Sequence, residues 1–202
     1  MTPLRSMARV LSIAGSDPSG GAGIQADLKT FAALDAYGMA AITSVTVQNT
    51  QGVYAVHPVP PGIVRRQIDA VAEDIGVDAA KTGLLADAGT VEAVVESVVR
   101  NGLERLVVDP VMAASSGHVL ADEGARAALV RLLLPHALVV TPNVPEAEAI
   151  AETPIHTEQD LRYAAARIYG KGARYVLIKG GHFGGEESTD YLYDGYGFRM
   201  YG

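Results

Sequence analysis

Cysteine and tryptophan are both absent from the 202-residue sequence, and aromatic residues make up only 6% of it. Without cysteine, these residues can form no disulfide framework, no thiolate metal site and no cysteine nucleophile. Hydrophobic residues still make up 49% of the chain, so the core must consist mainly of alanine, valine, leucine and isoleucine. Such a core suits the buried strands of a parallel sheet.

The sequence also lacks an excess of basic residues and any long apolar run. Aspartate and glutamate total 23 against 16 lysines and arginines, which gives a net charge of −7. This charge should repel polyanions, so we expect no nucleic-acid partner. The most hydrophobic stretch, residues 129–140, is interrupted by Arg131, Pro135 and His136, whereas a membrane-spanning helix needs roughly 20 consecutive apolar residues. We therefore expect a soluble, cytoplasmic protein without a membrane partner.

Short apolar segments alternate along the chain with segments of helical periodicity. The strands are expected at residues 10–14, 39–47, 79–82, 106–109, 138–141 and 175–179, with a hairpin formed by 190–193 and 198–201. The helices are expected from Ile24 toward a closing Gly38, from Pro60-Pro61 to Ile75, and at residues 91–99, 125–134 and 157–170. This alternation predicts one α/β domain over residues 1–202, with a mostly parallel sheet covered on both faces and a C-terminal β-hairpin.

Polar groups follow nearly every predicted strand. In sheets of this kind, ligands bind beyond the carboxyl ends of the strands, so these groups are candidates for a common site. They are Gly15-Ser16-Asp17, Gln48-Asn49-Thr50, Lys81-Thr82, Asp109, Thr141-Pro142-Asn143 with Glu146, and Lys179-Gly180-Gly181-His182.

Three features after the first strands admit a functional and a structural interpretation. The glycine-rich loop 17–23 could present backbone N–H groups to a ligand, or it could be only a tight strand-to-helix turn. Asp27 could face that ligand or simply be an acid favoured by the helix dipole. Gln48 ends a strand of β-forming residues, and its amide can both donate to and accept from the edge of a heteroaromatic ring. The alternative for Gln48 is a solvated strand end.

The later strand ends carry charge. Asp109 lies between an apolar strand and Pro110, with no helix to cap immediately after it. Asn143 and Glu146 are three residues apart, which suits Mg²⁺ held through waters but also helix capping by Asn143. Lys179 precedes two glycines and could reach a phosphate, whereas Lys81 could contact a ligand or be a salt-bridge partner. Carboxylates, an amide and a lysine at strand ends together favour phosphoryl transfer, which depends on positioning and charge neutralisation.

These residues resemble the bacterial hydroxymethylpyrimidine/phosphomethylpyrimidine kinases of thiamine biosynthesis, members of the ribokinase-like superfamily. The resemblance spans nearly the whole chain. It rests on residues 14–29 (AGSDPSGGAGIQADLK), Val47-Gln48-Asn49-Thr50, Lys81-Thr82-Gly83, residues 108–112 (VDPVM), Thr141-Pro142-Asn143 to Glu146, and Lys179-Gly180-Gly181-His182. It implies a three-layer α/β/α fold with a mostly parallel central sheet.

The resemblance also implies roles for individual residues. Gly15, Ala22, Asp27 and Gln48 match positions around the pyrimidine, with Gln48 at its ring nitrogen and amino edge and Asp27 on the hydroxymethyl side. Leu84 and Val111 match apolar ring contacts. Asp109 and Glu146 match acidic positions near Mg²⁺ and phosphate, Asn143 belongs to an Asn-x-x-Glu motif of the ATP site, and Lys179 matches a lysine that contacts ATP phosphates. Asp109 and Lys179 are the implied catalytic residues.

The expected reaction moves the γ-phosphoryl group of ATP onto hydroxymethylpyrimidine and then onto its monophosphate. The small-molecule pyrimidine and ATP are the expected partners, and we also expect a homodimer or higher homo-oligomer. The family continues into a Gly-Thr-Gly-Cys segment that forms an anion hole, and this sequence contains no such segment before Gly202. That absence makes a non-catalytic pyrimidine-binding fragment one alternative to the kinase. A pyridoxal kinase is the other, because related enzymes accept both ring types.

Overall fold

The computed structural model describes residues 7–113, 120–180 and 189–202. Nine strands form one sheet in the order β3-β2-β1-β4-β5-β6-β7-β8-β9. The strands are β1 (Arg9–Ser16), β2 (Tyr37–Asn49), β3 (Gly52–Pro58), β4 (Ala79–Thr82), β5 (Leu106–Val108), β6 (Val139–Val140), β7 (Tyr175–Ile178), β8 (Asp190–Tyr193) and β9 (Phe198–Tyr201).

The helices are α1 (Gly23–Ala33), α2 (Pro61–Asp74), α3 (Ala88–Arg100), α4 (Glu123–Ala128), α5 (Val144–Ala151) and α6 (Glu158–Tyr169). The six strands from β2 to β7 are parallel, while β3 joins one edge of the sheet and β8–β9 the other in antiparallel pairing. The predicted α/β fold, its mostly parallel sheet and its C-terminal hairpin are confirmed.

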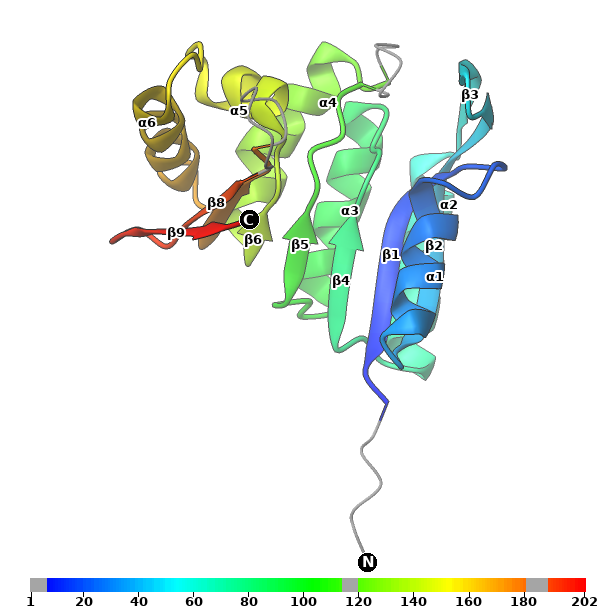
Figure 1. The fold of residues 1–202 in the computed structure, drawn as a ribbon. Coiled ribbons are helices and arrows are strands. Elements are labelled where there is room, and N and C mark those ends of the chain that lie inside the picture. The colour runs from blue at the N-terminus through cyan, green and yellow to red at the C-terminus, as the bar shows by residue number, and fades with distance from the viewer. Residues whose placement is uncertain (1–6, 114–119, 181–188) are drawn as a thin grey trace, which may run out of the picture.

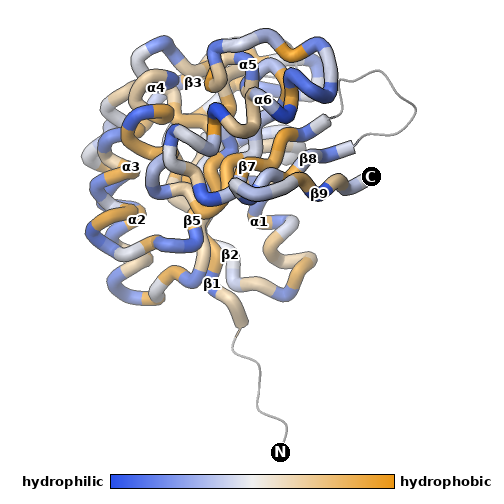
Figure 2. Tube along the Cα trace, turned by 90° about the vertical axis from the view of Figure 1, so that its left-hand side faces the viewer, coloured by the Kyte–Doolittle hydropathy of each residue, from blue (hydrophilic) through white to orange (hydrophobic). Residues whose placement is uncertain are grey.

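The two faces of the sheet are covered unequally. Helix α1 packs on β1 and β2 from one side, and α2 and α3 lie on the other side (Figures 1 and 2). We call these sides the α1 face and the α2–α3 face. On the α2–α3 face the strand residues Ile13, Leu106, Val108, Val140 and Val176 are fully buried. On the α1 face Val107, Val139 and Leu177 remain partly exposed. The main core therefore lies on the α2–α3 face.

Two predicted helices differ from those observed, and β3 and α5 were not among the predicted elements. The strand β3 pairs with β2 from Asn49 and Gly52 onward. The helix expected at 125–134 is shorter: α4 gives way to a π-helical turn over Leu129–Leu133 and a 3₁₀ turn over Leu134–His136. Helix α1 ends at Ala33 instead of continuing to Gly38.

Gly38 has a packing role instead of a capping role. The chain leaves α1 through Asp35, which has φ 54°, and Gly38 already lies inside β2. A Cβ atom on Gly38 would come within 2.8 Å of Leu28 and 3.2 Å of Phe31, both on α1. The glycine therefore allows α1 to lie close against β2.

Helices α3, α4, α5 and α6 begin at side-chain caps, which the sequence partly predicts. Thr157 and Asp160 form the predicted capping box of α6, with each side chain accepting a hydrogen bond from the backbone of the other. Asp87 caps α3 by accepting a hydrogen bond from the backbone N–H of Thr90. No helix in the described part of the chain is both long and apolar enough to cross a membrane.

Candidate active site

The order of the strands defines where a ligand should bind. The chain passes from β1 to β2 in one direction across the sheet and from β4 to β7 in the other, so the order reverses between β1 and β4. The carboxyl ends of strands at such a reversal form a crevice in open α/β sheets. A cavity of about 340 Å³ lies at this point, and this volume is in the range of small-molecule sites.

Nine of the ten site residues predicted from the sequence line this cavity. They are Gly15, Ala22, Asp27, Gln48, Leu84, Asp109, Val111, Glu146 and Lys179. They come from strand ends and helix starts that span more than 160 positions of the sequence, so the fold alone brings them together. Asn143, the tenth residue, is not among those that line the cavity. The predicted Gly181 and His182 lie outside the described residues.

The glycine-rich loop is organised by its own aspartate. The buried Asp17 carboxylate accepts hydrogen bonds from the backbone N–H groups of Ser19, Gly21 and Ala22 at 2.8–3.0 Å and from the Ser19 hydroxyl. Burial raises the pKa of Asp17, but these hydrogen bonds outweigh it and hold the pKa below its ordinary value. These three N–H groups therefore bind Asp17, and the sequence-based idea that they face a ligand is wrong for them.

Backbone shape brings the same loop close to β1. Gly23 begins α1 with φ +57°, and a Cβ atom there would collide with the carbonyl oxygen of Gly15. A Cβ atom on Gly15 would lie 2.6 Å from the Ser44 hydroxyl. Both glycines are therefore required for the close approach of loop and strand that forms this wall of the cavity.

The Gln48 amide is available for a ligand. Its Oε1 lies 3.4 Å from the Thr46 hydroxyl, which is long for an O–H···O hydrogen bond. That hydroxyl has a single proton, and it donates at 2.7 Å to the backbone carbonyl of Ser16. Gln48 thus lines the cavity with an amide that no described protein group engages closely.

Asn143 and Glu146 form a capping box at the start of α5. The Asn143 side chain accepts from the backbone N–H of Glu146 at 2.9 Å, and the Glu146 carboxylate accepts from the backbone N–H of Asn143 at 2.8 Å. The capping alternative is thereby confirmed for Asn143, and a phosphate contact by Asn143 stays a prediction. Glu146 caps the helix and also lines the cavity. Burial raises the pKa of Glu146, while its hydrogen bond from Asn143 and the Lys179 charge oppose the rise.

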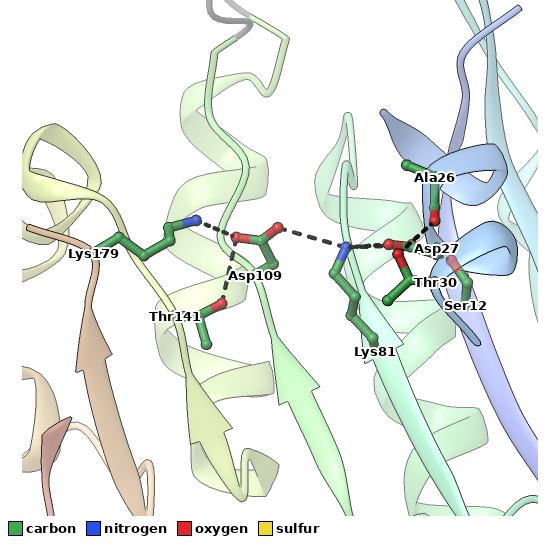
Figure 3. A network of polar contacts seen from close by, with 8 residues as sticks. All are labelled: Ser12, Ala26, Asp27, Thr30, Lys81, Asp109, Thr141 and Lys179. Carbon is green, nitrogen blue, oxygen red and sulfur yellow. Dashed lines mark hydrogen bonds and ion pairs between the residues drawn. The ribbon is translucent and has the colours of Figure 1, made fainter. Parts of the chain in front are cut away.

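Four charged side chains that line the cavity alternate in sign (Figure 3). They are Lys179, Asp109, Lys81 and Asp27. The Lys179 ammonium lies 3.0 Å from Asp109, and the Lys81 ammonium lies 3.6 Å from the other Asp109 oxygen and 3.2 Å from Asp27. The fully buried Ser12 hydroxyl donates to Asp27 at 2.6 Å. For Lys81 the sequence left a ligand contact and a salt bridge open, and the structure shows the salt bridges at a position that lines the cavity.

Ser12 and Lys81 are the residues that sequence reasoning underused. They are register partners on adjacent strands and project from the α1 face. The only sequence signal was a polar residue inside an otherwise apolar strand. Such a residue can equally be a hydrogen-bonded core hydroxyl, as for Ser12, or a salt-bridge partner, as for Lys81.

The phosphomethylpyrimidine kinase model matches residues 17–202. The chain belongs to this family. It is 49% identical over 191 residues to a hydroxymethylpyrimidine/phosphomethylpyrimidine kinase of Bacillus subtilis, covering 94% of this chain and 70% of that protein.

Solved structures of family members and of related kinases have the same fold. The phosphomethylpyrimidine kinase of Clostridium difficile 630 is 44% identical, with a TM-score of 0.89, over 96% of this chain and 84% of that one. The pyridoxal kinase of Staphylococcus aureus, solved with AMP-PCP and pyridoxal, is 38% identical, with a TM-score of 0.87, over 96% of this chain and 71% of that one. The predicted family and its ribokinase-like fold are therefore confirmed.

Proposed function

We propose that this phosphomethylpyrimidine kinase family member transfers the γ-phosphoryl group of ATP to 4-amino-5-hydroxymethyl-2-methylpyrimidine and then to its monophosphate, in cytoplasmic thiamine biosynthesis. The observation that carries the proposal is that nine of the predicted residues line one and the same cavity. Its lining includes an amide and apolar side chains suited to a heteroaromatic ring, and carboxylates and a lysine suited to phosphate.

The acceptor would lie between Gln48 and Asp27. The Gln48 amide would pair with the ring nitrogen and the amino group, since it has both a donor and an acceptor to offer. Leu84 and Val111 supply apolar surface for the ring. Asp27 is held by Ser12 and Lys81, so its carboxylate is positioned before the acceptor hydroxyl arrives. Such pre-positioning accounts for much of the rate gain in phosphoryl transfer.

The donor phosphates and Mg²⁺ would lie toward Asp109, Glu146 and Lys179. The Asp109 and Glu146 carboxylates line one cavity, and the Asp109 charge adds to the raised pKa of Glu146, so a cation there would relieve like-charge repulsion. The described residues contain no group of three or more metal-binding side chains. Mg²⁺ is usually held by one or two carboxylates and keeps several waters, so Asp109 and Glu146 would be enough to hold it. Mg²⁺ would neutralise developing phosphate charge. The Lys179 ammonium would leave Asp109 and contact a phosphate oxygen instead.

Substitution of Gln48 tests the acceptor site. Gln48→Ala should weaken binding of hydroxymethylpyrimidine by roughly tenfold or more, because two hydrogen bonds to the ring edge are lost. Titration calorimetry with the pyrimidine measures this directly, and Asp109→Ala should mainly lower ADP release while leaving pyrimidine affinity nearly unchanged. Unchanged pyrimidine affinity in Gln48→Ala would count against the assignment.

Two alternatives remain open to direct measurement. The similarity to a pyridoxal-bound kinase structure favours testing pyridoxal as a competing acceptor in the same assay, and preference for pyridoxal would replace the proposed substrate. A non-catalytic pyrimidine-binding fragment would bind hydroxymethylpyrimidine without releasing ADP from ATP. An ADP-release assay on residues 1–202 with hydroxymethylpyrimidine therefore separates the kinase from the fragment.

A further inference from the structure

Lys81 is a cation of the cavity to which the proposed reaction has so far assigned only a supporting contact with Asp27. Its ammonium contacts both Asp27 oxygens, at 3.2 and 3.3 Å, and approaches Asp109 at 3.6 Å. The side chain is 27% exposed and lines the cavity. It stands between the aspartate expected on the acceptor side and the one expected on the phosphate side (Figure 3).

Neither aspartate depends on Lys81 alone. Asp27 also accepts a hydrogen bond from the Ser12 hydroxyl at 2.6 Å, and Asp109 also accepts one from the Lys179 ammonium at 3.0 Å. The 3.6 Å separation between Lys81 and Asp109 is longer than a hydrogen bond. A lysine ammonium has three donors on a flexible stem. Lys81 can therefore donate a hydrogen bond to a third anion and still contact Asp27.

The second acceptor of the proposed reaction creates a need for such a charge. A phosphomonoester carries about −1.5 to −2 charges at pH 7, and it would enter a cavity already lined by Asp27, Asp109 and Glu146. Among the described lining residues the cations are Lys81 and Lys179. Lys179 is expected at the ATP phosphates. Lys81 is then the cation adjacent to Asp27, where the hydroxymethyl oxygen and its phosphate would lie.

We infer that Lys81 is a specificity-determining residue that admits the phosphomonoester acceptor, and is much less important for the uncharged alcohol. This inference rests on the proposed function. It assigns to the Lys81 side chain the difference in binding between the two proposed acceptors, the alcohol and its monophosphate. The alcohol needs only the Gln48 amide and the Asp27 carboxylate. The monophosphate needs in addition a compensating positive charge, without which it would be repelled by the carboxylates.

The test compares binding of the two acceptors by titration calorimetry, which requires no turnover. Lys81→Met should weaken the monophosphate at least about tenfold more than the alcohol, since a hydrogen bond to a charged group is lost. Lys81→Arg, which keeps the charge, should retain most of the selectivity. Lys171→Met is the matched control. Lys171 lies in the loop before β7, at the amino ends of the strands, whereas the cavity lies at their carboxyl ends. The substitution removes the same charge and should change neither affinity.

A second variant keeps the test independent of how well Lys81→Met folds. Asp27→Asn removes the carboxylate that competes for Lys81, so it should shift the ratio of affinities toward the monophosphate, the reverse of Lys81→Met. Equal losses for both acceptors in Lys81→Met, or an unchanged ratio in Asp27→Asn, would overturn the inference while leaving the kinase assignment intact. If the wild-type chain binds neither acceptor, the proposed function itself fails, and the inference fails with it.

Discussion

At the scale of single residues, two buried serines near the site have opposite roles. The Ser12 hydroxyl donates to Asp27 at 2.6 Å, whereas the fully buried Ser44 hydroxyl has no hydrogen-bond partner among the described residues. Ser12→Ala should lower the free energy of unfolding by about 1–3 kcal/mol, because a hydrogen bond to a charged group is lost. Ser44→Ala should be neutral or stabilising, since the alanine no longer buries an unpaired polar group.

Urea denaturation of the two variants beside wild type measures both effects. The substitution is chemically identical at the two positions, so each variant is the control for the other. A loss of 1 kcal/mol or more in Ser44→Ala would show that its hydroxyl is hydrogen-bonded in solution, for example by a buried water.

At the scale of elements, the glycine-rich loop between β1 and α1 depends on Asp17. Asp17→Asn replaces one carboxylate oxygen by a donor and should destabilise the protein by about 1–3 kcal/mol at pH 7, because loop N–H groups lose their acceptor. The pKa of Asp17 is lower in the folded chain than its ordinary value, so the folded state binds fewer protons. Its stabilisation is therefore complete above about pH 4 and is lost as the pH falls below that value.

Free energies of unfolding measured from pH 7 down to pH 3 check this argument. The difference between wild type and Asp17→Asn should shrink as the pH falls through the range below about 4. A difference that stays constant over this range would mean that the loss at pH 7 comes from packing and not from the carboxylate charge.

The elements also show what the sequence could and could not predict. Periodicity located β4, β8 and β9 at their observed bounds and the capping box of α6 at the observed residues, because these signals are local. Strand β3 was missed because it is a largely exposed edge strand without a buried alternating face. The interval before Gly38 was misread because Asp35 supplies the left-handed turn that a glycine was expected to supply.

The site was predictable to the extent that strand ends are predictable. Polar residues at the ends of parallel strands meet at one edge of the sheet, which is why Gln48, Asp109 and Lys179 were found without coordinates. Lys81 was left undecided and Ser12 was not considered, because their importance depends on which residues lie opposite them across β1, β4 and β5. Pairing of that kind is set by strand order, which the sequence pattern leaves open. The expected homo-oligomer is not tested by the structure and stays a prediction.

At the scale of the whole molecule, stability should reside mainly on the α2–α3 face of the sheet. Leu106 on that face is fully buried, while Leu177, on the α1 face, is partly exposed. Leu106→Ala should cost about 2–5 kcal/mol, the usual range for emptying a packed core position. Leu177→Ala should cost less than about half as much, because part of the leucine surface remains in contact with water in the folded state.

Urea denaturation with a common slope for all three proteins compares the two variants with wild type, and the comparison is fair because the same atoms are removed at both positions. The ratio of the two losses then reports how unequal the two faces are in solution. Equal losses would mean that Leu177 is as well packed as Leu106, and therefore that the α1 face is covered in solution. In that case the exposed part of this face would be an interface.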